Sequence, residues 1–238
     1  LSIRRQRQMC IRDRYNSVPE LKKAVANEIK KYVSSGGFMF AMCSATDSFD
    51  IALAALNVDI AASVYDGTPI DRDYNSKLNF NNTLAFKDFS LYTSPNIYEF
   101  STIDLPSSHK PKTTGAEADY FTLFEFSAKW DQVPTMLTQN HVSMINGFMG
   151  QTTGFNKDFL KNNVLIMGED ASINQAKYIH GNIGKGTFTF LGGHDPEDYK
   201  HFVGDPQTDL SLHRNSPGYR LILNNLLFPA AKKKKRKT

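Results

Sequence analysis

The feature that most constrains the fold is a short apolar run that ends at a cysteine. Residues 38–42 read Phe-Met-Phe-Ala-Met, a pattern typical of a strand buried on both faces. Apolar residues at helical spacing precede this run over 21–33 and follow it over 47–56. The order helix, strand, sharp turn, helix predicts an α/β three-layer domain, in which ligands bind at the carboxyl ends of parallel strands.

The rest of the chain predicts further strands and one more helix. From 64 to 104 the sequence is rich in Asn, Asp, Thr and Ser and is interrupted by aromatic and aliphatic residues, which predicts two or three short strands. With the Pro- and Lys-containing loop that follows, they form a β-rich insertion over 64–118. Strands are also predicted at 121–126 and 164–167, a hairpin with a glycine-rich turn at 176–191, and a closing helix at 219–227.

Composition and charge limit the number of domains and the kind of partner. With 238 residues, 40% of them hydrophobic, the chain can bury one sizeable core, and we assign 15–231 to a single domain. The sequence has no apolar stretch long enough to span a membrane. The net charge of the whole chain is +4. Residues 1–14 contribute +4 and the basic tail 232–238 contributes +6, so the domain between them has a net negative charge. We therefore expect no nucleic-acid partner, because phosphate binding requires clustered cations on the folded surface.

Residues 4–14 resemble a translated DNA-library adapter. They read Arg-Arg-Gln-Arg-Gln-Met-Cys-Ile-Arg-Asp-Arg, which matches one reading frame of a transposon adapter. We therefore expect 1–14 to lie outside the fold, and the natural chain to begin near Tyr15 within a longer reading frame that is truncated at its N-terminus here. The alternative is a natural basic arm. If the adapter supplies Cys10, the one natural cysteine is Cys43, which excludes an intramolecular disulfide.

Cys43 stands where the apolar strand stops and the next helix begins. Its small neighbours Ala41 and Ala45 permit a tight strand-to-helix turn, which is the layout of a nucleophile elbow. A helix N-terminus lowers the pKa of a thiol, and the amide of Ser44 would lie where it can help to hold an oxyanion. The alternative is that Cys43 is a small, inert hydrophobic residue at the end of a buried strand.

His194 is the candidate base for this thiol. It follows the second strand of the predicted hairpin, in a glycine-rich turn with Asp195 and Glu197 directly behind it. A histidine oriented by a carboxylate is the partner that a thiol nucleophile requires. The remaining histidines in the domain match no metal-ligand spacing, so we predict no metal site and no cofactor; they are His141, His180, His201 and His213.

The cysteine elbow and the late His-Asp-Pro-Glu run resemble the class I glutamine amidotransferase-like domain. The resemblance implies a flavodoxin-like sheet with Cys43 as nucleophile, His194 as base and Glu197 as orienting acid. The chain departs from the family pattern at the elbow, where alanines replace the flanking glycines. It also has Asp195 inserted before the Pro-Glu pair, so that Asp195 competes for the orienting role. The second oxyanion donor of the family lies on a loop upstream of the elbow.

A longer resemblance covers nearly everything after Tyr15. The runs 36–50, 193–199 and 216–231 are similar to a Bacteroidota family commonly labelled asparagine synthetase B. The resemblance implies a protein about twice as long, with an upstream α/β half and an export-like start, and hence a location in the cell envelope or periplasm. The alternative is the cytoplasm. Residues 35–37 read Ser-Gly-Gly but lack the Asp and Ser of a pyrophosphate loop, so the residues do not predict ATP-dependent amide synthesis.

These observations predict cysteine-dependent hydrolysis or transfer of an amide group, with a small-molecule amide or another polar ligand as the partner. The alternative is a non-catalytic module of the cell envelope that binds a ligand in the same crevice. If the folded chain places the Cys43 sulfur beside the His194 imidazole, the enzyme is favoured over the binding module.

Overall fold

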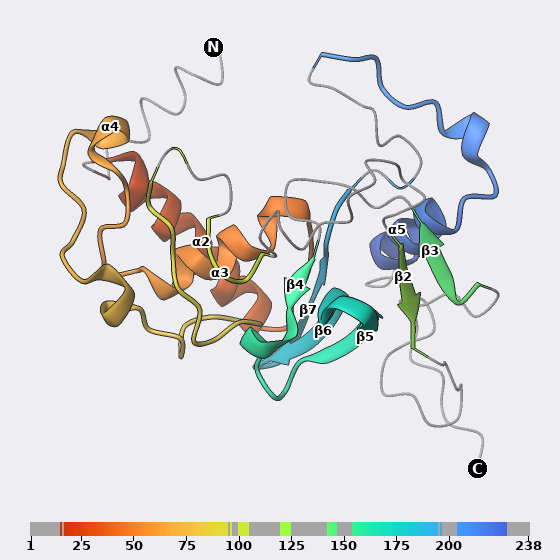
Figure 1. Ribbon diagram of the computed structural model, residues 1–238, viewed down its shortest axis with the longest axis horizontal. Helices are drawn as coiled ribbons and strands as arrows, with labels where there is room; N and C mark the ends of the chain where they lie inside the picture. The colour runs from red at the N-terminus through yellow and green to blue at the C-terminus, as the bar shows by residue number, and fades with distance from the viewer. Residues whose placement is uncertain are drawn as a thin grey trace.

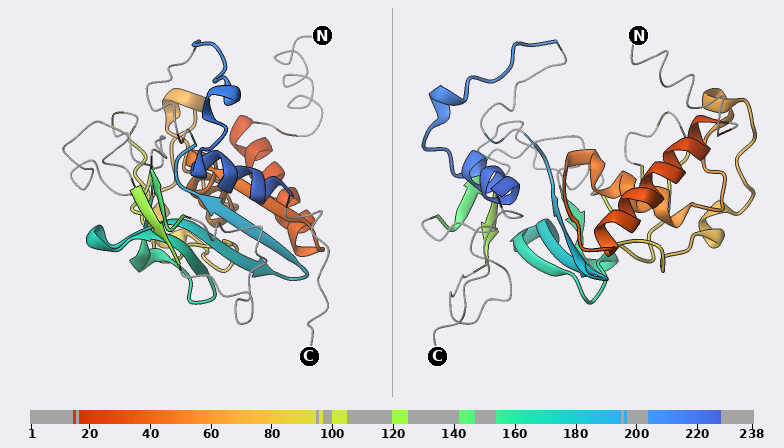
Figure 2. Two further views of the ribbon diagram at one scale, coloured as in Figure 1. Left: turned by 90° about the vertical axis from the view of Figure 1, so that its right-hand side faces the viewer. Right: turned by 180° about the vertical axis from the view of Figure 1, so that it is seen from behind.

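The computed structural model describes residues 15, 17–94, 96, 100–104, 120–124, 142–146, 154–194, 196 and 204–227. In this part of the chain a curled, mixed β-sheet lies between two helices on one side and a third on the other (Figure 1, Figure 2). The first two are α2 (Val18–Ser34) and α3 (Asp47–Ala54), and the third is α5 (Pro217–Leu227). The α/β class predicted from the sequence is therefore confirmed.

The described strands form one sheet of seven, in the order β1-β7-β6-β5-β2-β3, with β4 paired to β6. The β1–β7 pair is parallel, and the other strand pairs are antiparallel. The strands are β1 (Phe38–Met42), β2 (Tyr120–Leu123), β3 (Met144–Asn146), β4 (Phe155–Asn156), β5 (Leu165–Asp170), β6 (Gln175–Ile183) and β7 (Gly186–Leu191).

The helix, strand, turn and helix predicted at the start of the domain are all present. Ser17 caps α2 by accepting the amide of Glu20 at 3.3 Å, and Ser17 with Glu20 three residues later has the sequence pattern of a capping box. Strand β1 follows, and a single 3₁₀ turn, η1 (Cys43–Ala45), joins it to α3. The parallel pairing of β1 confirms the expectation that the turn stands at the carboxyl end of a parallel strand.

Strands β6 and β7 form the predicted hairpin. Ile183 pairs with Gly186, so Gly184 and Lys185 alone make the turn. Gly184 has a φ of 57°, and a Cβ built on it would collide with the carbonyl oxygen of Ser34 at the end of α2. Glycine is therefore required here both by the backbone conformation and by the close approach of the helix.

Two clusters of buried apolar side chains cover the two faces of the sheet. The cluster on the α2 and α3 side contains four phenylalanines whose rings lie within about 6 Å of a neighbour in the cluster: Phe86, Phe155, Phe188 and Phe190. The cluster on the α5 side includes Tyr178, Leu191 and Leu221. The hydroxyl of Tyr178 accepts a hydrogen bond from the amide of Asn225 at 3.0 Å, which ties α5 to β6.

The strands predicted over 64–104 are not formed in the described residues of this segment. It holds the short helices α4 (Ser63–Asp66) and η2 (Tyr74–Lys77), and it contributes single β-bridges at Phe86, Leu91 and Asp104. The β-rich insertion is therefore wrong for this part of the chain, and its remainder, 105–118, lies outside the described residues.

In this segment, side-chain oxygens accept backbone amides that would be bonded to a neighbouring strand in a β-ladder. The carboxylate of Asp50 accepts the amides of residues 84–86, and Oδ1 of Asn75 accepts the amide of Leu91 at 2.7 Å. Asp50 outside this segment and Asn75 within it thus accept amides that lie 34 to 36 and 16 residues away in the sequence.

The remaining described elements are short. They are the 3₁₀ turns η6 (Lys157–Phe159), η7 (Ala171–Ile173) and η8 (Leu210–His213). Among the described residues, we find no helix with the length and apolar character needed to cross a bilayer. The segments 1–14 and 232–238, which we assigned to an adapter and a basic tail, lie outside the described residues.

Candidate functional site

Cys43 occupies a strained turn between β1 and α3. Its φ is 54°, in the left-handed region, whereas Met42 before it is extended, with φ −132° and ψ 154°. Holding a non-glycine residue in this region costs on the order of 1–3 kcal/mol, and such residues concentrate at functional sites. The backbone at Cys43 therefore forms the sharp strand-to-helix elbow that the sequence predicts.

Thr46 fixes the carbonyl group of Cys43. The amide of Thr46 donates to this oxygen at 3.1 Å, and its hydroxyl donates to the same oxygen at 2.7 Å. Thr46 is fully buried, so both bonds are shielded from water. Because the Cys43 carbonyl and the Ser44 amide belong to one planar peptide unit, these bonds also fix the direction in which the Ser44 N–H points.

The Cys43 side chain lies just beneath the surface. It is a reduced thiol in a residue that is 9% exposed, and neither apolar cluster includes it. Ser44 beside it is half-buried and Ala45 is exposed. The Cys43 side chain is therefore covered in the folded protein.

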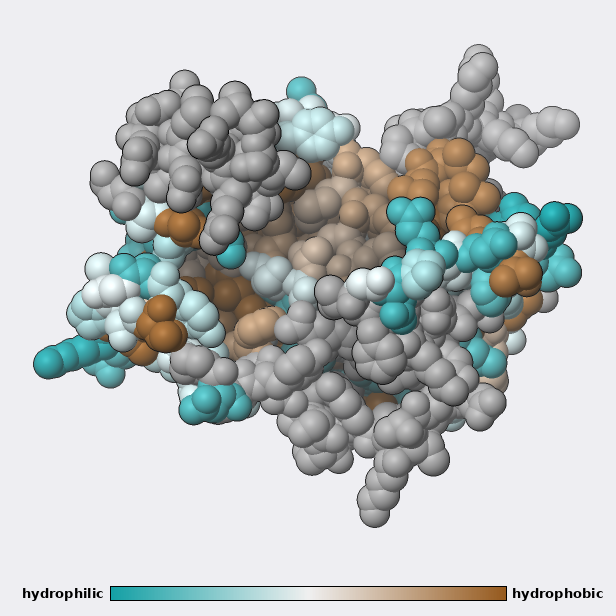
Figure 3. Space-filling view, turned by 90° about the horizontal axis from the view of Figure 1, so that it is seen from above, coloured by the Kyte–Doolittle hydropathy of each residue, from teal (hydrophilic) through white to brown (hydrophobic). Residues whose placement is uncertain are grey.

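The structure brings His194 to the same edge of the sheet as Cys43. Met42 pairs with Leu191 at the ends of two adjacent parallel strands, and Cys43 and His194 follow those ends by one and three residues. Adjacent strands lie about 4.8 Å apart. Gly193, with a φ of 76°, turns the chain between β7 and the exposed His194. Seen from above, the middle of the molecule is a hollow lined mainly by hydrophobic residues (Figure 3).

The two candidate orienting carboxylates, Asp195 and Glu197, lie outside the described residues. Which of them orients His194 stays a prediction from the sequence.

A buried lysine near this edge was missed by the sequence analysis. Lys177 on β6 is 2% exposed, and its carbonyl accepts the amide of Gly192, the first residue after β7, at 2.7 Å. The pairing of β5 with β6 slips next to Lys177, as in a β-bulge. Burial lowers the pKa of Lys177 to about 7, and the nearby charge of Asp104, itself 3% exposed, opposes that shift. The available signal was a lysine flanked by Ala176 and Tyr178 within the predicted hairpin.

His180 is structural rather than part of a metal site. Its Nδ1 lies 2.9 Å from the Thr189 hydroxyl on the neighbouring strand, and the residue is 6% exposed. Within the described residues there is no group of three or more His, Cys, Asp or Glu side chains that could hold a metal ion. His141 and His201 lie outside those residues, and His213 is on η8 against the ring of Tyr219.

We expect His180 to make the folded state sensitive to acid. Burial lowers the pKa of His180 from 6.5 to about 4, so the unfolded chain binds the proton more readily between these values. The contribution of His180 to stability is therefore complete above pH 6.5 and is lost as the pH falls toward 4, by roughly 3 kcal/mol. Urea unfolding of wild type and His180→Asn between pH 4 and 7.5 measures this difference. A difference that does not change with pH would contradict the assignment.

Comparison of this chain with family models, curated proteins and solved structures finds no match.

Proposed function

We propose that this chain carries a cysteine-dependent amide hydrolase or transferase site, in a flavodoxin-like domain of the class I glutamine amidotransferase type. The observation that supports it is the combination of a strained elbow at Cys43 with His194 at the end of the adjacent parallel strand. The strained elbow alone, or the histidine alone, would also be compatible with a protein that has no catalytic site. Together they place Cys43 and His194 just beyond the ends of adjacent parallel strands, an arrangement from which a thiol and its base can approach each other.

The chemistry assigns one role to each group. The His194 imidazole takes the thiol proton, and the Cys43 sulfur attacks the amide carbonyl to form a tetrahedral oxyanion. The Ser44 amide, whose direction the Thr46 bonds fix, donates to that oxyanion. Collapse breaks the C–N bond, the amine leaves with the proton from His194, and a thioester remains. Water, or an amine acceptor in the transferase case, then releases the acyl group.

The second candidate is a ligand-binding module without chemistry. The 9% exposure of Cys43 favours this alternative, because a nucleophile must be reached by its substrate. The reactivity of the folded protein distinguishes the two.

We expect Cys43 in the folded protein to react with iodoacetamide, and His194→Ala to slow that reaction about tenfold or more at pH 7, because the thiol loses its base. The measurement is site-resolved mass spectrometry in a Cys10→Ser background, which leaves one cysteine. His213→Ala, which removes a histidine on η8, is the matched control and should keep the wild-type rate. Labelling that occurs only after denaturation would reject the enzyme and support the binding module.

A further inference from the structure

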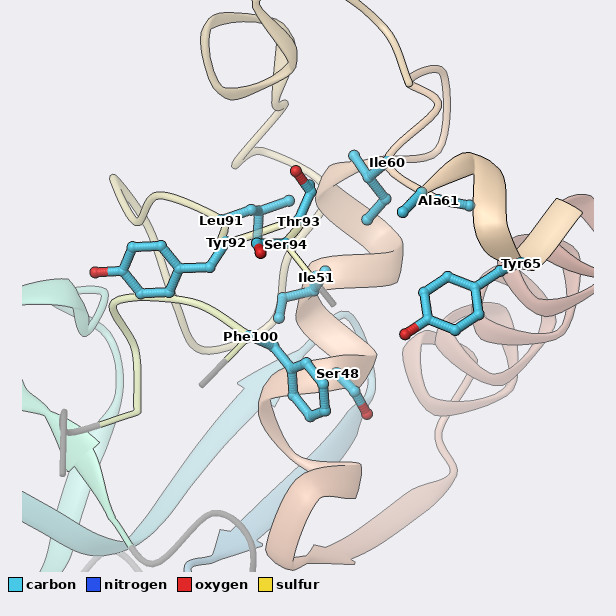
Figure 4. Close-up of a pocket in the computed structure, with 11 residues that line it drawn as sticks. Ser48, Ile51, Ile60, Ala61, Tyr65, Leu91, Tyr92, Thr93, Ser94 and Phe100 are labelled. Carbon is cyan, nitrogen blue, oxygen red and sulfur yellow. The ribbon is translucent and has the colours of Figure 1, made fainter. Parts of the chain in front are cut away.

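A cavity of about 310 Å³ lies against the outer side of α3 (Figure 4). This volume is within the range of small-molecule sites. Besides α3, the described residues that line it come from 60–65, which includes the start of α4, and from 91–94 and 100. The residues that line it are Ser48, Ile51, Ile60, Ala61, Ala62, Tyr65, Leu91, Tyr92, Thr93, Ser94 and Phe100.

The lining is aromatic and aliphatic, with hydroxyl groups as its main polar side-chain atoms. Tyr65 is 72% exposed, and Tyr92 and Phe100 are each 42% exposed, so three rings at the rim still contact water. None of the lining residues carries a formal charge. A ligand group that enters here gains by covering apolar surface, whereas an ionised group would lose hydration without finding a countercharge.

The cavity reaches the first turn of the helix that follows the cysteine elbow. Ser48, which lines the cavity together with Phe100, is in the first turn of α3, five residues after Cys43 (Figure 4). The 3₁₀ turn Cys43–Ala45 leads directly into α3, so little more than one helical turn separates Ser48 from Cys43. A molecule with its carbonyl at the elbow can therefore place a side group of ordinary length in the cavity.

We infer that this cavity binds the uncharged apolar or aromatic side group of the acyl substrate that Cys43 attacks. The inference rests on the proposed function, and it names the substrate class: an amide of an acyl group with an aromatic or large aliphatic side chain. It disfavours glutamine itself, because the charged amino and carboxylate groups of glutamine meet no opposite charge in this lining.

Matched electrophiles test the preference in the Cys10→Ser background. We compare the rate at which N-acetyl-phenylalanine chloromethyl ketone alkylates Cys43 with the rate for its glutamate analogue. Each rate is divided by the rate of the same reagent with free cysteine. The expected result is a rate at least about tenfold higher for the phenylalanine reagent, with saturation at high concentration. Ala61→Trp, which fills the cavity, should abolish this ratio. Val64→Trp places the same indole on a neighbouring residue that is 73% exposed and does not line the cavity, and it should keep the ratio.

A binding measurement separates failure of the inference from failure of the proposed function. N-acetyl-phenylalaninamide is titrated into the Cys43→Ala protein and followed by NMR, with N-acetyl-glutamate amide as the comparison. Selective binding of the phenylalanine compound that Ala61→Trp removes supports the inference even if Cys43 proves unreactive with iodoacetamide. Equal binding of both compounds, or a preference that Ala61→Trp leaves unchanged, overturns it.

Discussion

Asp50→Ala is expected to lower the free energy of unfolding by about 3–5 kcal/mol. Asp50 is fully buried on α3, and its two carboxylate oxygens accept the amides of Leu84, Ala85 and Phe86 at 2.7, 2.7 and 2.9 Å. Alanine leaves these three donors without their acceptor. Each buried donor that loses its partner costs about 1–3 kcal/mol, and part of that cost is offset because no carboxylate has to be desolvated.

Chemical denaturation at pH 7, followed by circular dichroism, measures the change. Asp209→Ala is the matched control, because Asp209 is exposed and accepts one backbone amide, that of Ser211, at 2.9 Å. We expect that control to lose no more than about 1 kcal/mol. If both variants lose the same amount, the bonds to residues 84–86 do not hold this segment to α3.

The pH dependence of the Asp50 contribution has a definite sign. Burial raises the pKa of Asp50 from 3.8 to about 6, against the opposing effects of the three amides and the charge of Lys161. The folded protein therefore binds the proton more tightly, and the Asp50 contribution declines as the pH rises from about 4 to 6, by roughly 3 kcal/mol. His180 acts in the opposite direction over nearly the same range. Wild type should thus show a flatter profile than either single variant.

The sequence predicts the regular part of this fold well because local signals and burial agree there. The capping box at Ser17, the apolar run at 38–42 and the glycines around 184 each indicate the element that the structure contains. The segment 64–104 could not be predicted in the same way. Its conformation depends on acceptors that lie far away in the sequence, above all Asp50, which is 34 to 36 residues from the amides that it binds.

The candidate site likewise has one part that the sequence indicates and another part that it does not. The elbow at Cys43 and the turn before His194 are local features, so the sequence indicates both, and the pairing of Met42 with Leu191 brings them to one sheet edge. The cavity beside α3 is built from residues between 48 and 100, and the Lys177–Asp104 interaction joins two separate segments. Such contacts depend on chain packing, which a sequence pattern does not contain.

We expect the Lys177 contribution to stability to increase as the pH rises from about 7 to 10.5. Burial lowers the pKa of Lys177 from 10.5 to about 7, so in this range the unfolded chain binds the proton and the folded chain releases it. Stability that depends on this group is therefore present above pH 10.5 and is lost as the pH falls toward 7. The full change is at most roughly 5 kcal/mol, which makes it one of the largest effects expected for this protein.

Lys177→Met tests this, because methionine keeps the length and apolar volume of the side chain but does not titrate. The free energy of unfolding is measured at half-unit steps between pH 7 and 10, and the difference between wild type and variant should grow in favour of wild type with each step. Lys22→Met makes the same change at an exposed position of α2 and should show no such growth.

Asp104→Asn addresses the partner of Lys177. Asp104 favours the charged lysine, so its loss should lower the lysine pKa further, and at pH 7 Lys177 then folds as the neutral amine after releasing its proton. We expect Asp104→Asn alone to lower the free energy of unfolding, and to lower it less when Lys177→Met is already present. Additive losses in the double variant would mean that the two buried side chains stabilise the fold independently, and that the interaction between β6 and the 100–104 segment is not electrostatic.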